Sequence, residues 1–164
     1  MEKYHLSIRV LHWLVAACVI GMLILGFLMD SRDQYNLHKS IGVSILILMA
    51  IRIISRLSTK TPDFPEQIKN NEAILAKLGH FALYAFLIIM PLSGWLMSNF
   101  GGHAVKLFGL EVFTLVEKNK ELGKLAREAH EIIAYILIFL ISIHVLAALK
   151  HLIMDKVNLL KRIM

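Results

Sequence analysis

The sequence predicts an all-α fold, a bundle of four helices that each cross a membrane. Of the 164 residues, 57% are hydrophobic, and the mean hydropathy of +0.66 is far above that of a soluble domain of this length. The apolar residues fall into four blocks, each bounded by charged residues. A helix of about 20 residues covers the roughly 30 Å of hydrocarbon in a bilayer. We therefore place the spans at about residues 8–29, 38–57, 79–100 and 130–153, within a single membrane domain of residues 1–164.

Each span has its own local signals. The first follows Lys3 and Arg9, as a signal peptide would, but its apolar run is too long and no small-residue cleavage site follows. We expect it to remain as a membrane anchor. The second reaches full length if residues 37–40 enter the headgroup layer. The third contains Pro91, which we expect to kink it, and the fourth continues a charged helical stretch that begins near Glu117.

The distribution of basic residues predicts the orientation of the bundle. Eleven of the 18 lysines and arginines lie on the side of the two termini, either in the N-terminal segment, the second connection and the C-terminal segment or in the span ends that adjoin them. Because cytoplasmic loops carry an excess of such residues, we expect both termini to be cytoplasmic and the long segment Gly101–Ala129 to lie outside. The net charge of +6 is explained by this topology, and we expect no binding to nucleic acid.

The composition excludes several classes of redox and metal centre. The single cysteine, Cys18, lies inside the first span, so the chain has no disulfide framework and no C-x-x-C-H motif for covalent haem. No carboxylate lies inside the apolar block of any span, since Glu131 precedes the fourth block, and this excludes carboxylate-bridged metal centres and acidic proton relays.

Histidines are the residues that indicate chemistry. Ionisable side chains within membrane spans are costly and mark functional sites. His5 and His103 lie in flanking or loop sequence, where we expect solvent to surround them. The other six of the eight histidines lie at or in the spans: His12, His38, His80, His130, His144 and His151.

The predicted topology pairs these histidines by depth. His38 and His130 both lie toward the outside, whereas His12 lies toward the inside with either His144 or His151. His130 and His144 are nearly four helical turns apart, about 40° around the helix and roughly 21 Å along it. They are too far apart to share one metal ion, so one helix would serve two stacked sites.

Paired imidazoles from facing helices are the axial ligands of low-spin b haem. The alternative is that the histidines only form hydrogen bonds across helices or reach toward the interface. A small residue follows four positions after each of His12, His38, His130 and His144, where a flat ring would approach the helix, whereas Asp155 follows His151. This pattern favours His144 over His151 as the inner partner of His12.

The sequence resembles the bacterial cytochrome b561 proteins, which belong with the cytochrome b subunits of nickel hydrogenases. The resemblance covers essentially the whole chain and follows an ordered set of motifs. These are His12-Trp13, His38 with Gly42, Leu48-Met49-Ala50-Ile51-Arg52 to Arg56-Leu57, Gly79-His80, Met90-Pro91-Leu92-Ser93-Gly94, His130-Glu131, His144, Ala147-Ala148-Leu149-Lys150-His151 and Asn158–Met164.

This resemblance implies a multi-pass protein of the bacterial inner membrane that holds two b haems. His12 and His144 would bind the inner haem, and His38 and His130 the outer one. It also implies electron exchange with ubiquinone near the inner side, where His151 is the matching position. Some relatives are regarded as superoxide oxidases, which pass an electron from periplasmic superoxide to quinone, so superoxide is one expected donor.

Further residues are candidates for supporting roles. Arg9 and Arg52, together with Arg56, would bind the propionates of the inner haem or serve only as topology charges. His80 is a weaker quinone candidate than His151, and Trp13 is expected to be an interfacial anchor.

The expected function is therefore transfer of electrons from a periplasmic donor to the ubiquinone pool, which would make the protein a superoxide:ubiquinone oxidoreductase if superoxide is the donor. The alternative is a haem b membrane anchor for a soluble hydrogenase- or dehydrogenase-type partner. A metal or solute transporter would hold no haem.

Overall fold

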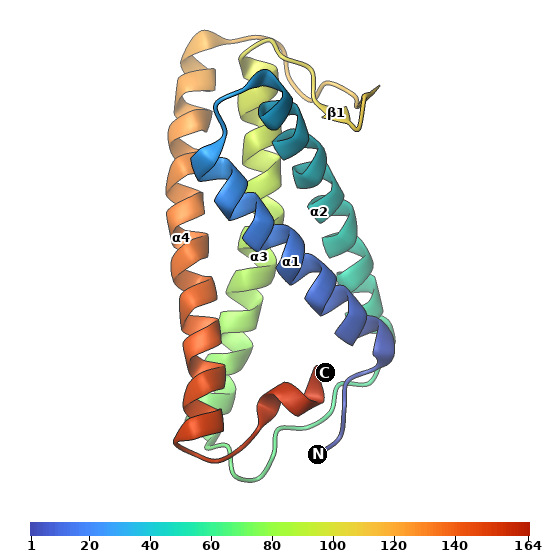
Figure 1. Ribbon diagram of the computed structural model, residues 1–164, viewed down its shortest axis with the longest axis vertical. Helices are drawn as coiled ribbons and strands as arrows, with labels where there is room; N and C mark the ends of the chain where they lie inside the picture. Colours follow the sequence, from blue (N-terminus) through green and yellow to red (C-terminus); the bar gives the residue numbers. More distant parts are fainter.

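The computed structural model describes residues 1–164, which form four long helices that run alternately up and down the bundle (Figure 1). The helices are α1 (Leu6–Leu28), α2 (Arg32–Ser58), α3 (Asn70–Phe100) and α4 (Lys120–Ile153). All four are long and apolar enough to cross a membrane. The prediction of four such helices is confirmed, and each predicted span overlaps one of them, while a short β-hairpin is added to the all-α bundle that the sequence predicted.

Helices α2, α3 and α4 begin well before the predicted spans, and polar side chains accept hydrogen bonds from their first residues. Ser31 Oγ accepts a hydrogen bond from the backbone N–H of Gln34, whose side chain accepts one from Ser31 in return. Glu72 accepts from the backbone N–H of Lys69 at the start of α3, and the Asn119 side chain accepts two hydrogen bonds from the first turn of α4. His5, which we expected to be solvated, caps α1 through its ring nitrogen. These polar turns extend the helices past the apolar blocks.

The helices pack in chain order, α1 on α2, α2 on α3 and α3 on α4, with little direct contact between α1 and α4. Val15, Val19, Ile45 and Met49 form the buried cluster at the centre of the α1–α2 contact. Only 17 of the 164 residues are buried, because most apolar side chains of the spans point outward, toward the position of the lipid.

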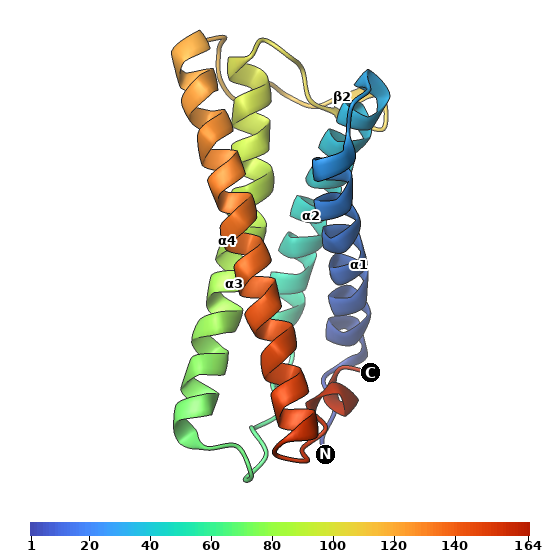
Figure 2. The same cartoon turned by 60° about the vertical axis from the view of Figure 1, so that its left-hand side comes forward.

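A short β-hairpin closes one end of the bundle, which we call the hairpin end. Its strands are β1 (Lys106–Leu107) and β2 (Leu110–Glu111), paired antiparallel beside the first turns of α2 (Figure 2). The backbone N–H of Phe108 donates to Ser40 Oγ at 3.1 Å, and Val105 packs in a buried cluster with Trp95. The hairpin therefore has a defined position over α2.

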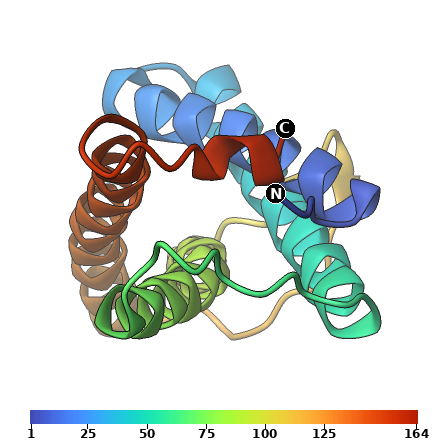
Figure 3. The same cartoon turned by 90° about the horizontal axis from the view of Figure 1, so that it is seen from below.

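The opposite end carries both chain termini, and we call it the terminal end. After α4 the chain turns beneath the bundle as the C-terminal strap, residues 154–164, which contains the 3₁₀ helix η1 (Leu159–Arg162) (Figure 3). Trp13 Nε1 donates to the carbonyl of Ile163 at 3.1 Å, so this tryptophan has a structural partner in addition to its expected place at the interface. The strap thus connects the end of α4 to α1.

Arg162 fixes the strap in place. Its side chain is buried, and one of its terminal nitrogens donates to the carbonyls of Pro62 and Asp63 at 2.9 and 2.7 Å. The guanidinium also lies over the ring of Tyr4, 5.3 Å from the centroid. One side chain therefore joins the C-terminus, the N-terminal segment and the α2–α3 connection.

We expect Arg162→Ala to lower the free energy of unfolding by about 2 kcal/mol, because buried carbonyls lose charged donors. Thermal unfolding in detergent should show a lower Tm, with faster proteolysis near Asp63. Lys161→Ala is the matched control, since Lys161 is exposed. Equal Tm values for the two variants would contradict this role.

Candidate functional site

Four of the predicted histidines lie in two facing pairs at different heights in the bundle. Toward the hairpin end, His38 of α2 faces His130 of α4, with ring centroids 6.3 Å apart. Toward the terminal end, His12 of α1 faces His144 of α4, with centroids 6.2 Å apart. All four side chains are half-buried. The structure therefore places His38 opposite His130, as depth had paired them, and places His12 opposite His144, one of the two partners that depth had left open.

The spacing within each pair suits two axial ligands of one metal ion. An imidazole nitrogen lies about 2 Å from a metal ion that it binds, and the ring centroid lies about 1 Å behind that nitrogen, so two imidazoles on opposite sides of one ion have centroids about 6 Å apart. Both pairs match this value. The donor set thus fits an iron porphyrin held between helices.

His130 is held in the tautomer that a metal requires. Ser93 Oγ donates its hydrogen to the carbonyl of Met90 at 2.7 Å, so at 2.9 Å from His130 Nδ1 it can only accept. The proton of His130 therefore lies on Nδ1, and Nε2 keeps a free lone pair. Gly94 makes room for the ring, because a Cβ at this position would lie 2.9 Å from Cε1 of His130.

His38, the facing residue, has a buried ring nitrogen without a partner. Its Nδ1 is enclosed and forms no hydrogen bond within the chain. Gly26 of α1 lies against this ring, where a Cβ would be 3.4 Å from Cε1. Buried polar atoms are normally paired, so an unpaired imidazole nitrogen indicates a site built for a ligand.

His12 has a different neighbour from His130. Arg52 lies 2.9 Å from His12 Nδ1 through its terminal nitrogen, and its Nε donates to the hydroxyl of Tyr84 at 3.1 Å. A guanidinium can only donate, so Nδ1 accepts and the proton lies on Nε2. A metal bond through Nε2 would move that proton to Nδ1, and Arg52 would then turn to another acceptor.

His80 adds a third imidazole beside the pair at the terminal end. Its ring lies edge-on to His144, with centroids 5.4 Å apart, and its side chain is exposed. This separation is shorter than that of the two facing pairs. His80 therefore lies beside His144 as a neighbour, whereas His12 lies at the distance of an opposite axial ligand.

Two further arginines lie toward the terminal end, as the sequence predicted. Arg9 precedes His12 by one helical turn, and its Nε is buried without a hydrogen-bond acceptor. Arg56 follows Arg52 by one turn and lies over the ring of Tyr4, 5.1 Å from the centroid. An unpaired buried donor on a cation is costly, so Arg9 fits an anionic group that the chain itself does not supply.

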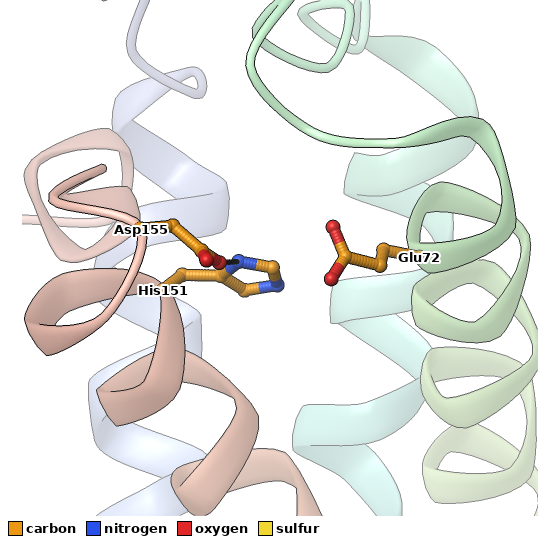
Figure 4. Close-up of side chains that lie close together, drawn as sticks. All are labelled: Glu72, His151 and Asp155. Atoms are coloured by element: carbon orange, nitrogen blue, oxygen red, sulfur yellow. Dashed lines mark hydrogen bonds and ion pairs between the residues drawn. The ribbon is translucent and has the colours of Figure 1, made fainter.

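His151 belongs to a separate charged cluster at the terminal end. Its Nδ1 donates to Asp155 at 2.6 Å, and its ring extends toward Glu72 of α3 (Figure 4). Lys150 donates to Asp155 at 2.7 Å and to Glu72 at 2.5 Å. Hydrogen bonds from Lys150 and His151 hold the pKa of the Asp155 carboxyl below its usual value.

The ligand-type atoms of Glu72, His151 and Asp155 lie within 4.8 Å of one another. The Lys150 ammonium already supplies the positive charge between the two carboxylates, so the cluster is complete as an ion-pair network. Sequence reasoning noted Asp155 four residues after His151 but did not predict the ion pair that this helical spacing allows. It missed Glu72, because it searched inside the spans and Glu72 lies outside them.

Comparison with known proteins identifies the family of this chain. The sequence pattern of the family described as "Prokaryotic cytochrome b561" matches residues 3–164. "Cytochrome b561 homolog 2" of Escherichia coli (strain K12) is 30% identical over 99% of this chain and 92% of its own length. "Probable superoxide oxidase CybB" of Yersinia pestis is 30% identical over 100% of this chain and 97% of its own. "Cytochrome b561 homolog 1" of Escherichia coli (strain K12) is 28% identical over 100% of this chain and 98% of its own length. The chain therefore belongs to the prokaryotic cytochrome b561 family, membrane proteins that transfer electrons with haem b.

Proposed function

We propose that this cytochrome holds two b haems and passes electrons across the bacterial inner membrane, from a donor at the hairpin end to ubiquinone at the terminal end. The observation that supports it is the presence of two imidazole pairs at axial-ligand spacing, 6.3 and 6.2 Å between centroids, which share α4. Ligation by two histidines leaves iron no open position, so such sites carry electrons and do not bind oxygen.

In this proposal each haem b supplies one-electron redox chemistry, and the chain positions it. His38 and His130 bind the outer haem, and His12 and His144 the inner one. Arg9, with its unpaired buried Nε, and Arg52, released from His12, bind the propionates of the inner haem. Arginine suits this task because its donors match a carboxylate geometrically.

The orientation follows from charge. The terminal end carries most of the basic residues, so both termini face the cytoplasm and the hairpin end faces the periplasm. Electrons would then cross the membrane inward.

The quinone would bind at the terminal end beside His151. Nδ1–H of this histidine donates to Asp155 at 2.6 Å, so the imidazolium form, with a second proton on Nε2, would donate from Nε2–H to a quinone carbonyl. Reduction of a quinone to a quinol consumes protons, and His151 is placed to deliver one while Asp155 balances its charge. His80 is the second candidate for this role.

Superoxide is the donor that the comparisons favour, through the name of the Yersinia relative. Each superoxide gives up one electron and leaves as O₂, and two electrons with two protons convert one ubiquinone to ubiquinol. The hairpin end offers a cleft of about 340 Å³, whose lining includes Asn99, His103 and Lys118. Asn99 lies about 8 Å along α3 from Gly94, which contacts His130.

A docked redox protein is the second candidate donor. The tip of the hairpin exposes Phe108 and Leu110, which are 69% and 75% exposed. A hydrogenase- or dehydrogenase-type partner could cover these side chains, and the cytochrome would then act as its membrane anchor.

The haem content gives the first test. A pyridine haemochrome assay should find two b haems per chain, and His144→Ala and His38→Ala should each retain one. His80→Ala is the control and should retain both. Loss of a haem from His80→Ala with both retained in His144→Ala would reassign the inner ligand, and a colourless protein expressed with ample haem would refute the proposal.

Gly94→Ala should disturb the outer site alone. The added Cβ would lie 2.9 Å from Cε1 of His130, so the ring must move from its axial position. We expect loss of the outer haem, or a changed low-spin signal from it in electron paramagnetic resonance spectra. Gly21→Ala is the matched control, because nothing lies within 4 Å of a Cβ there. Identical spectra for both variants would contradict the assignment of His130.

Stopped-flow absorbance should separate the donor step from the acceptor step. Superoxide should reduce the haems much faster than background, and superoxide dismutase should abolish this phase. His151→Ala should leave that phase unchanged but slow reoxidation by a short-chain ubiquinone at least tenfold, because the quinone loses a hydrogen-bond donor. Reduction no faster than background rejects superoxide and favours the protein partner, and unchanged reoxidation places the quinone elsewhere.

A further inference from the structure

We propose that the side chains beside the two histidine pairs hold the two haem sites at different reduction potentials, with the terminal-end site the higher. Electrons would then move from the hairpin end to the terminal end down a gradient that the chain itself creates. The inference rests on the proposed assignment of His12, His38, His130 and His144 as haem ligands.

At the hairpin end, Ser93 makes His130 a stronger electron donor to its metal. The hydroxyl gives its hydrogen to Met90 at 2.7 Å and accepts the Nδ1–H of His130 at 2.9 Å. An imidazole that donates its other N–H gains negative character and becomes a more basic ligand. A more basic ligand favours the oxidised iron, so this contact lowers the potential of the hairpin-end site.

At the terminal end, the corresponding nitrogen of His12 has no acceptor beside it. The group at 2.9 Å is the guanidinium of Arg52, which cannot accept a hydrogen bond. Whether Arg52 stays there or turns toward a propionate, it remains anchored to α2 beside this pair. A positive charge near a redox centre favours the form with the extra electron, so Arg52 raises the potential of this site.

Charged residues adjacent to the ligands along the chain strengthen the contrast. The helix turns that flank the terminal-end site add Arg9 and Arg56 to Arg52. At the hairpin end, Lys39 follows His38 and Glu131 follows His130, so one positive charge is matched by one negative charge. Three cations, two of them assigned above to propionates, therefore flank the terminal-end ligands along the chain, whereas a balanced pair of charges flanks the ligands at the hairpin end.

A redox titration of the purified cytochrome in detergent tests this directly. The α-band absorbance should resolve two potentials, and the component missing from His144→Ala identifies the terminal-end haem. Arg52→Gln should lower the potential of that haem alone, and Ser93→Ala should raise the potential of the other alone. We expect each variant to change its reduction equilibrium at least threefold, which is about 28 mV for one electron.

Matched controls separate tuning from general damage. Lys77→Gln removes an exposed charge near the same end, and Ser142→Ala removes a hydroxyl that donates to a backbone carbonyl of α4 at 2.8 Å. Neither control variant should change the reduction potential of either haem. Ser93→Thr keeps a hydroxyl, so the hairpin-end haem should have its wild-type reduction potential. Arg52→Lys keeps a positive charge, so the terminal-end haem should have a reduction potential close to the wild-type value. If Arg52→Gln loses its haem, Arg9→Gln should lower the same potential.

The results that overturn the inference differ from those that overturn the proposed function. Two bound haems with equal potentials, or with the hairpin-end haem higher, refute the gradient and leave the ligand assignment intact. An unchanged or lower potential in Ser93→Ala would show that the Met90 carbonyl, and not the Ser93 hydroxyl, holds His130, and it refutes the role of Ser93. A chain that binds no haem refutes the function itself.

Discussion

The arrangement of this protein depends on imidazoles that face each other from different helices at matching depth. A histidine in a membrane span is costly unless it has a partner, and each of these four points at another across about 6 Å. The helices that carry them must therefore keep a fixed height and rotation relative to one another. The caps, the hairpin over α2 and the C-terminal strap all contribute to holding that register.

The four helices and much of the arrangement of the histidines could be predicted from the sequence alone. Apolar blocks of span length gave the four helices, and the fourteen-residue spacing of His130 and His144 indicated two heights on one helix. Depth paired His38 with His130 and left His12 with either His144 or His151, and the small residue four positions after His144 favoured that histidine. In the structure His38 faces His130 and His12 faces His144. Depth can be inferred in this way because helical rise and bilayer thickness are nearly constant.

The rest depended on contacts between segments that are distant in the sequence. The role of Ser93 requires knowing that α3 presents its hydroxyl to α4, and the role of Gly94 requires the approach of the His130 ring. In the sequence nothing distinguishes Arg162 from the other basic residues near the C-terminus. In the structure it is buried against the α2–α3 connection and the N-terminal segment. Glu72 lies far from His151 in the chain, and only the packing of α3 on α4 joins them through Lys150.

The scarcity of contact between α1 and α4 has a consequence for assembly. Two helical hairpins, α1–α2 and α3–α4, are joined along the α2–α3 side, while on the opposite side α1 meets α4 through the ring pairs His12–His144 and Phe27–Tyr135 and through the strap beneath them. An iron held between His12 and His144, as proposed, would therefore join the first helix to the last on the side where the helices themselves make little contact.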